Sequence, residues 1–277
     1  MVYLIPTPIG NIEDISFRSL KILSEMQILL CEDTRVTKKL LNLLSKRFDT
    51  DFNIEKFISF HSHNDKKVLE NFEADFFDKK IAFLSDAGMP CVSDPGAKLV
   101  KFCQENKIEY EVLPGANAVL LAYAASGFDT ARFMFYGFLP HKGKERENAL
   151  NYILGMDVAV IVYESPHRIE KFAEELAKAD PDRNIFAIKE ATKQFEKKFF
   201  TTAKRFVDLL KQSNTKGEWS IVIEPVSLCS GEKINEHDIL SLDIHPKAKA
   251  KLLAKIKGIG TKECYEMLIK DKKISLE

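Results

Sequence analysis

Polar and charged residues follow short apolar runs at several points in this chain of 277 residues. Open α/β sheets bind their ligands at such strand ends. The longest segment of this kind spans residues 84–96, LSDAGMPCVSDPG. Its small residues would let a ligand approach the backbone closely, and its length after a single apolar run is greater than a simple turn needs. We therefore expect this segment to bind a ligand.

Other apolar runs also end in charged residues. The first, Cys31-Glu-Asp-Thr-Arg35, allows two interpretations: Thr34 caps a helix, or Asp33 and Arg35 belong to a polar site. Runs in the second half of the chain lead into Glu164, His167, Arg168, Lys189, Glu190, Lys193 and Glu224. A histidine at a helix start often bonds only to its own backbone, so His167 alone does not indicate catalysis.

The elements that would position these residues alternate between apolar runs and amphipathic stretches of helical period. This alternation predicts an α/β fold. Nine runs are expected to be strands, which suit two sheets better than one: Val2–Ile5, Ile28–Cys31, Phe57–Phe60, Ile81–Leu84, Tyr110–Leu113, Phe133–Phe138, Val158–Tyr163, Ile185–Ile188 and Trp219–Ile223. A Pro-Gly turn after Leu113 precedes a small-residue helix, Ala118 to Ser126, and marks a domain boundary.

Composition restricts the function classes. With 45% hydrophobic and 30% charged residues, the chain is neither collagenous nor disordered. Its 41 basic and 41 acidic residues balance, so the molecule has no net charge that would attract a polyanion. A polyanion site must therefore be local. The segment Pro246–Lys273 has nine lysines and three acidic residues, and it is expected to form two helices joined by Lys257-Gly-Ile-Gly260. This turn could present N–H groups to phosphate, or it could be an ordinary turn beside a solvated lysine face.

No metal, membrane or disulfide is expected. The five cysteines are scattered without a CxxC motif, and His61 and His63 have no third ligand residue near them. No apolar run reaches the roughly 18 residues that a membrane span requires. The amino-terminus also lacks a basic segment followed by a long apolar stretch. A cytoplasmic protein with reduced thiols is expected.

Seven groups of residues together resemble the ribosomal RNA small subunit methyltransferase I family, part of the tetrapyrrole methylase superfamily. They occur in order between Leu4 and about Leu268: PTPIGN at 6–11, EDTR at 32–35, SDAG-x-P with SDPG at 85–96, LPG at 113–115, GFLP at 137–140, YESPHR at 163–168 and E-x-TK at 190–193. The family methylates the 2′-oxygen of a cytidine in 16S rRNA and uses S-adenosylmethionine.

The resemblance implies two α/β domains of tetrapyrrole-methylase type, residues 1–114 and 115–228, with the cofactor in the cleft between them. A basic helical tail, 229–277, would follow, and the protein would form a homodimer acting on 16S rRNA or the small ribosomal subunit. The implied cofactor-binding residues are Pro6, Asp86, Ala87, Gly88, Met89, Ala116, Asn117, Tyr163, Ala191 and Pro225.

A ribose hydroxyl is a poor acid, so a basic group or a cation must assist its reaction with a methyl donor. Glu164, Lys189 and Glu190 lie at suitable strand ends, and the choice among them stays open. The residues expected to bind RNA phosphates are Arg35, Arg168, Lys193, Lys257 and Lys262.

The chain departs from the family pattern in two places. It has Ala116-Asn117 where the family usually has Pro-Ser, and Phe195–Thr201 lacks a commonly found glycine. Two other functions remain as alternatives. Carbon methylation of a tetrapyrrole would use the same cleft but would not need a basic tail. A non-catalytic RNA-binding protein would not need the intact loop 85–96.

Overall fold

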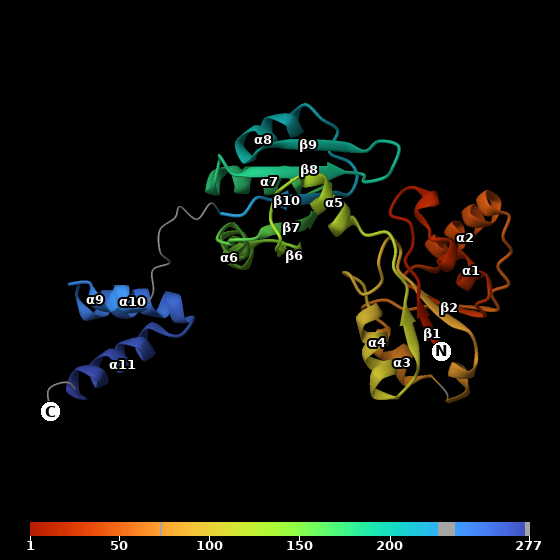
Figure 1. Cartoon of the computed structure of the whole chain (residues 1–277), viewed down its shortest axis with the longest axis horizontal. Coiled ribbons are helices and arrows are strands. Elements are labelled where there is room, and N and C mark those ends of the chain that lie inside the picture. Colours follow the sequence, from red (N-terminus) through yellow and green to blue (C-terminus); the bar gives the residue numbers. More distant parts are fainter. Residues whose placement is uncertain (73, 227–235, 275–277) are drawn as a thin grey trace. The chain divides into compact units, whose positions relative to one another are not determined.

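The computed structural model describes residues 1–72, 74–226 and 236–274 (Figure 1). Contacts divide the chain into two compact units, Met1–Val226 and Ser227–Glu277. The first unit contains two five-stranded sheets, and the second is helical. The expected α/β class with two sheets is confirmed.

The first sheet is entirely parallel, with strand order β3-β2-β4-β1-β5. Its strands are β1 (Val2–Leu4), β2 (Ile28–Cys31), β3 (Lys56–Ser59), β4 (Ile81–Leu84) and β5 (Tyr110–Val112). The accompanying helices are α1 (Phe17–Ser24), α2 (Thr34–Phe48), α3 (Asp65–Glu70) and α4 (Gly96–Glu105), with 3₁₀ turns at Ile12–Asp14 and Ala74–Asp78.

Helices cover both faces of this sheet, as its continuous apolar strands require. Leu29 of β2 packs in one core cluster with Leu23 and Leu41 of α1 and α2. Its neighbour Leu30 packs in another with Leu99 of α4. Because both faces are buried, the carboxyl edge is where the loops of this sheet can meet a ligand.

The second sheet has strand order β6-β7-β10-β8-β9 and is mixed. Only β6 and β7 pair in parallel; the other three pairs are antiparallel. The strands are β6 (Phe133–Phe138), β7 (Ala159–Glu164), β8 (Asn184–Lys189), β9 (Lys197–Thr202) and β10 (Trp219–Ile223). The helices are α5 (Ala118–Ser126), α6 (Gly143–Leu154), α7 (Ile169–Ala179) and α8 (Ala203–Lys211).

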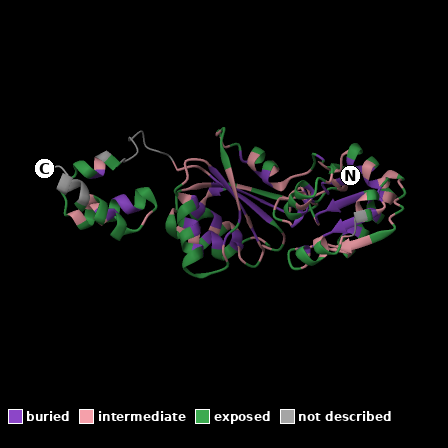
Figure 2. Ribbon diagram, turned by 90° about the horizontal axis from the view of Figure 1, so that it is seen from below, coloured by how far each residue is buried: buried purple, intermediate pink, exposed green. Residues whose placement is uncertain are grey.

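Trp219 belongs to the larger core cluster of this sheet, together with residues of α6, α7 and α8. Residues of α5 form a smaller cluster with other residues of the same strands. Figure 2 shows the buried strands between these more exposed helices. Both faces of the second sheet are therefore covered, like those of the first.

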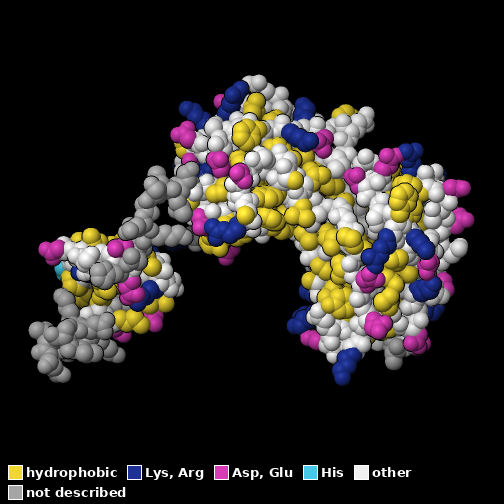
Figure 3. Space-filling view, in the orientation of Figure 1, with side chains coloured by type: hydrophobic (Ala, Val, Ile, Leu, Met, Phe, Trp, Pro, Cys, Tyr) yellow, Lys and Arg dark blue, Asp and Glu magenta, His cyan; other side chains and the backbone are white. Residues whose placement is uncertain are grey.

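The second unit consists of α9 (Glu236–Ser241), α10 (Pro246–Lys257) and α11 (Thr261–Ile274). A small core of Ile239, Ala250, Leu253, Ala254 and Cys264 joins them. Gly258 ends α10 with φ +67°, and its N–H donates to the Ala254 carbonyl. The two expected helices and their glycine turn are confirmed, and α9 is an addition. Figure 3 shows hydrophobic side chains at the surface of this unit, and Leu252 and Ile256 of α10 are among the exposed ones.

All nine expected strands are present, and the tenth, β9, was missed. β9 is an edge strand with Lys197, Lys198 and Phe200 exposed, so its sequence lacks the apolar run that marks a buried strand. The division at residues 114 and 115 stays a prediction, since the two sheets belong to one compact unit. The expected boundary between 228 and 229 lies outside the described residues.

Cys31, Cys103 and Cys264 are buried, Cys91 is half-buried, and Cys229 lies outside the described residues. None of the helices within residues 1–72, 74–226 and 236–274 combines the length and the apolar composition that crossing a bilayer requires.

Phe172 of α7 offers a test of the second core, because its side chain is fully buried in the cluster around Trp219. We expect Phe172→Ala to lower the free energy of unfolding by about 3–5 kcal/mol, since the cavity adds to the lost burial. Glu174→Ala on the exposed side of the same helix should change it by less than about 0.5 kcal/mol. Urea unfolding of both variants measures the difference; equal stabilities would contradict the packing.

Candidate active site

Three loops at the carboxyl edge of the first sheet lie against one another. Thr7, after β1, and Gly88, after β4, exchange two backbone hydrogen bonds of 3.0 Å. A Cβ atom on Gly88 would lie 3.5 Å from the Ala116 carbonyl oxygen, and one on Gly115 would lie 2.4 Å from Pro6 Cβ. The expected cofactor residues Pro6, Gly88 and Ala116 are therefore brought together.

The backbone conformation at position 88 requires glycine, whether or not a ligand binds beside it. The φ of Gly88 is +85°, where a side chain is strained, and a Cβ would come within 3.0 Å of Ile9. The carbonyl of Gly88 also accepts a hydrogen bond from the Ser85 hydroxyl. A valine at this position would distort the loop before it met a cofactor, so Gly88→Val is not a clean test of binding.

Acidic residues line the same edge. Asp86 accepts a hydrogen bond from the Asp33 N–H at 3.0 Å, and its own N–H donates to Glu32 at 3.4 Å. Burial raises the pKa of both Glu32 and Asp86, and nearby carboxylates add to the effect. These hydrogen bonds tie the loop after β2 to the loop after β4.

The helix that follows β2 is capped by Asp33, and the expectation that Thr34 is the cap was wrong. The Asp33 carboxylate accepts the Arg35 N–H at 2.8 Å, and Thr34 is already helical. The Arg35 guanidinium pairs with the same carboxylate and holds the pKa of Asp33 down to about 2. Arg35 is 89% exposed at its side chain, so this pairing leaves it accessible to solvent.

Residues of the second sheet join the loop after β4 through an apolar cluster. Val92 of that loop packs in the cluster that contains Val119 of α5, with Tyr163 and Ala191. Tyr163 stands beside Phe135 and Phe138, with ring centroids 4.8 and 5.6 Å away. Burial raises its pKa to about 12. The predicted cofactor residues Tyr163 and Ala191 thus share one cluster with the loop of the first sheet.

Asn117 has a structural role that the sequence did not reveal. It is the N-cap of α5, and its side-chain oxygen accepts the N–H groups of Val119 and Leu120 at 2.9 and 3.2 Å. Serine, the usual family residue at this position, caps helices equally well. The departure from the family pattern therefore preserves the local structure.

The loop between β8 and β9 contacts the loop after β1. Thr192 accepts the Asn11 N–H at 3.0 Å, and a Cβ on Gly10 would lie 2.5–2.8 Å from atoms of Thr192, Lys193 and Ala191. Glu190 and Thr192 both have positive φ, 53° and 63°. Backbone strain of this kind persists only where surrounding contacts impose it, and it is common at functional sites.

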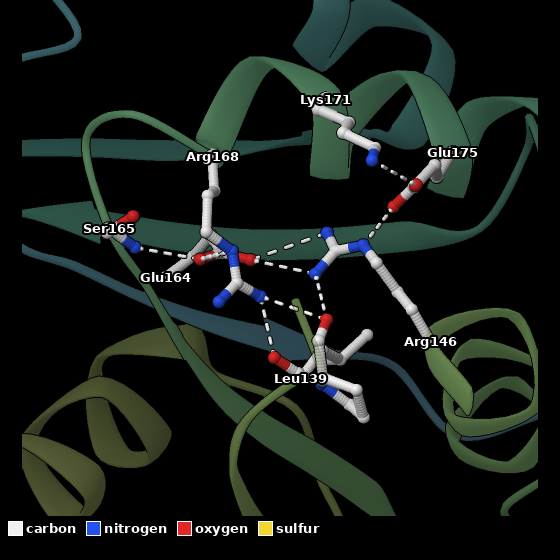
Figure 4. A network of polar contacts seen from close by, with 8 residues as sticks. Leu139, Arg146, Glu164, Ser165, Arg168, Lys171 and Glu175 are labelled. Carbon is white, nitrogen blue, oxygen red and sulfur yellow. Dashed lines mark hydrogen bonds and ion pairs between the residues drawn. The ribbon is translucent and has the colours of Figure 1, made fainter. Parts of the chain in front are cut away.

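Glu164 is enclosed in an ion network (Figure 4). Its side chain has no exposed surface; Arg146 lies 3.4 Å from one carboxylate oxygen and Arg168 lies 3.1 Å from the other. Arg146 also bonds to Glu175 at 2.6 Å, and Arg168 donates to the Leu139 carbonyl at 2.6 Å. The network ties the end of β7 to α6, α7 and the segment after β6.

The other two expected catalytic residues differ in access. Lys189 is buried, and its Nζ donates to the Asn214 carbonyl at 2.6 Å. Glu190 is half-buried and accepts the Glu218 N–H and the Lys193 ammonium, both at 2.9 Å. Burial alone raises the pKa of Glu190, but these two hydrogen bonds outweigh it and hold the pKa below its usual value. All three catalytic assignments stay predictions, and Glu190 is the most accessible of the three.

Pro225 is set apart from the other expected cofactor residues of the second sheet. Strand β10 is antiparallel to β7, so Ile223 pairs with Val160 while Ser220 pairs with Tyr163. Pro225 therefore follows the strand end away from Tyr163. Its role in cofactor binding stays a prediction without a described contact to the others.

The residues expected to bind RNA fall into two groups. Arg168 uses its donors on Glu164 and on backbone carbonyls, and Lys193 lies between Glu190 and Glu218 at 2.9 Å from each. Lys257 pairs with Glu236, while Lys262 is exposed near the start of α11. The structure thus leaves Arg35 and Lys262 accessible and gives Arg168 a structural partner.

Among the residues that the structure describes, no group of three or more His, Cys, Asp or Glu side chains is placed to hold a metal ion.

Comparisons with known proteins show the family to which the chain belongs. Residues 1–207 match the family described as Tetrapyrrole (Corrin/Porphyrin) Methylases. A Campylobacter fetus protein named ribosomal RNA small subunit methyltransferase I is 48% identical over 97% of this chain and 100% of its own length. A protein of the same name from Helicobacter pylori strain J99 is 43% identical over 99% of each chain. The chain belongs to the ribosomal RNA small subunit methyltransferase I family, within the tetrapyrrole methylases.

Solved structures show the same fold at lower identity. A cobalt precorrin-4 methyltransferase matches with a TM-score of 0.60 and 16% identity over 80% of this chain and 94% of its own. Uroporphyrin-III C-methyltransferase from Thermus thermophilus, in complex with S-adenyl homocysteine, matches with a TM-score of 0.53 and 20% identity over 80% of this chain and 96% of its own. The fold of this methyltransferase family member is thereby confirmed.

Glu164 allows a structural role to be separated from a catalytic one. We expect Glu164→Gln to lower the free energy of unfolding by about 3–5 kcal/mol, because it removes the buried counter-charge of Arg168 and one of the two carboxylates that Arg146 contacts. Glu174→Ala on α7 serves as the control. Urea unfolding and methyl transfer are measured on the same samples. A variant with unchanged stability and lost turnover would contradict the structural role.

Proposed function

We propose that this protein transfers a methyl group from S-adenosylmethionine to the 2′-oxygen of a cytidine in small-subunit ribosomal RNA. The main support is identity of 48% over nearly the full chain, tail included, to a relative named as a ribosomal RNA methyltransferase. The gathering of Pro6, Gly88, Ala116, Tyr163 and Ala191 from two sheets supports it independently. We further propose that the activity is cytoplasmic.

The residues at this edge fit the proposed cofactor. Gly88 and Ala116 keep the meeting point of the loops free of large side chains, and Tyr163 and Val92 contribute apolar surface. When bound, S-adenosylmethionine supplies an electrophilic methyl group on a positively charged sulfur. Exposed and half-exposed residues of the loop, Ala87 and Met89, are available to contact it.

The protein must position the acceptor ribose and assist its reaction, either with a base that takes the hydroxyl proton or with a cation that stabilises the developing oxyanion. Much of the rate in such a transfer comes from holding the oxygen in line with the methyl carbon. Among the predicted residues, Glu190 adjoins Ala191 in the loop that contacts the first sheet, and its partner Lys193 has a raised pKa. Burial alone lowers that pKa, but the carboxylates of Glu218 and Glu190 outweigh it. A lysine that stays protonated can stabilise negative charge on the oxygen, and the Glu190 carboxylate holds the lysine in place.

We also propose that the chain forms a homodimer. Within each subunit, residues 1–114 and 115–228 would form separate domains. The family resemblance supports both statements. Mass measurement by light scattering at micromolar protein concentration tests the first. A monomer under conditions of full activity would contradict it.

The proposed reaction can be tested directly. Purified protein, S-adenosylmethionine with a labelled methyl group, and either free 16S rRNA or small subunits from a strain lacking this gene would be combined. Mapping of 2′-O-methyl groups should find a single labelled cytidine. Label on a tetrapyrrole and not on RNA would establish the alternative carbon methylation. Binding of RNA without any transfer would establish the non-catalytic alternative.

Ala116 tests the cofactor assignment without straining a glycine. Ala116→Leu should weaken S-adenosylmethionine binding about tenfold or more, because overpacking a tight site costs roughly 1–3 kcal/mol. Ala179→Leu, at the exposed end of α7, is the matched control and should bind normally. Calorimetric titration measures both. Unchanged affinity in a folded Ala116→Leu protein would remove Ala116 from the site.

The helical tail tests RNA binding apart from cofactor binding. Residues 1–226 form a compact unit, so a chain ending at Val226 should bind S-adenosylmethionine as the full chain does. Its RNA affinity should fall, and the dependence of that affinity on salt should flatten by about 0.7 in log–log slope for each lost phosphate contact. The same RNA affinity and slope in both proteins would show that the lysines of the tail are merely solvated.

A further inference from the structure

A groove of about 670 Å³ lies between three segments of the first unit. They are the loop after β1, the last turn of α2 and the β8–β9 loop, and they contribute Gly10, Asn11, Lys46, Arg47, Lys193 and Gln194 to the lining. This volume is within the roughly 300–1,000 Å³ that ligand sites occupy. The groove is distinct from the meeting point of Pro6, Gly88 and Ala116, but it shares the loop after β1 with it.

The groove receives cations from two elements. Arg47 pairs with Glu13, and Lys193 pairs with Glu190 and Glu218. Lys46 makes no ion pair with any residue in the described part of the chain. A lysine in the last turn of a helix is favoured by the helix dipole, which explains its presence on α2. Because Arg47 and Lys193 both have carboxylate partners, Lys46 is the cation of this lining that can contact a phosphate without breaking a described ion pair.

The β8–β9 loop also carries an exposed aromatic ring. Phe195 is 71% exposed, although the backbone around it is firmly held. The Thr192 N–H donates to Glu196 at 2.7 Å, and the Lys193 N–H donates to the Glu190 carbonyl at 3.0 Å. An exposed ring on an ordered loop beside a basic groove has the features of a stacking surface for a nucleobase.

We propose that this groove and Phe195 hold a single-stranded segment of the RNA substrate. Lys46 would contact a backbone phosphate, and Phe195 would stack on a base. The proposal rests on the proposed function, because the same loop carries Ala191 and Glu190. Phe195 lies four positions after Ala191, so an RNA held there would bring a ribose near the proposed cofactor site.

Lys46 tests the phosphate contact. Binding of a single-stranded RNA oligonucleotide is measured by fluorescence anisotropy at several salt concentrations, with the full chain. Lys46→Gln should lower the log–log salt slope by about 0.7 and weaken binding several-fold at low salt. Lys178→Gln is the matched control, since Lys178 also occupies the last turn of a helix, α7, but lies outside the groove. Both variants should keep their affinity for S-adenosylmethionine.

Phe195 tests the stacking contact. Phe195→Ala should weaken RNA binding about tenfold, a typical loss for one stacked base, with no change in the salt slope. Phe195→Trp should retain or strengthen binding. Phe200→Ala is the control, because Phe200 is 67% exposed on β9 of the same hairpin but lies against Phe128, with ring centroids 5.9 Å apart.

The outcomes separate this proposal from the proposed function. A wild-type protein that neither binds nor methylates RNA would overturn both. A wild-type protein that methylates RNA, with Lys46→Gln and Phe195→Ala retaining full affinity and salt slope, would overturn the groove alone. A Phe195→Ala variant with altered oligomeric mass and unchanged RNA affinity would show that the ring belongs to a contact between two copies of the chain, which also overturns it.

Discussion

The Glu164 carboxylate at the end of β7 has no exposed surface, so it needs opposite charges close to it. This need constrains the elements of the second sheet that carry those charges. The two oxygens of Glu164 are met by Arg146 from α6 and Arg168 at the start of α7. Each arginine also bonds outside the pair, to Glu175 or to carbonyls after β6. A buried ion pair gains little net stability over apolar packing, but breaking one is costly. The network therefore acts mainly by fixing one arrangement of β6, β7, α6 and α7. Tyr163 directly precedes Glu164 in β7, so the same network also fixes its position.

Close backbone approach imposes the corresponding constraint on the first sheet. Gly88, Gly115 and Gly10 each lie where an added carbon would come within 3.0 Å of a neighbour. The hydrogen bonds between Thr7 and Gly88 then fix the loop after β4 against the loop after β1. A site formed by backbone groups in this way depends little on flexible side chains. It can hold a small cofactor through positioned N–H and carbonyl groups, which agrees with the small residues that the sequence places there.

The strands and most of the site could be predicted because they depend on local patterns. Apolar runs of four to six residues located nine strands, and motif spacing located the segments that carry Asp86, Tyr163 and Glu190. Strand β9 was missed because an edge strand with exposed lysines does not show the apolar pattern of a buried one. The pairing of Glu164 with Arg146 could not be predicted, since Arg146 lies 18 residues away and no local pattern links the two. Capping by Asp33 instead of Thr34 was a narrower error, because both residue types cap helices.

The loop from Glu190 to Glu196 shows how one segment can serve two purposes. Two residues with positive φ cost free energy, of order 1–3 kcal/mol each, and surrounding bonds must offset it. Those bonds come from both sides: Glu218 just before β10, and Asn11 in the loop after β1. A loop held by two sheets cannot shift without disturbing both. Ala191 at one end and Phe195 at the other are therefore kept in a fixed relation, as is required when a bound nucleotide must meet a methyl group at a defined distance and angle.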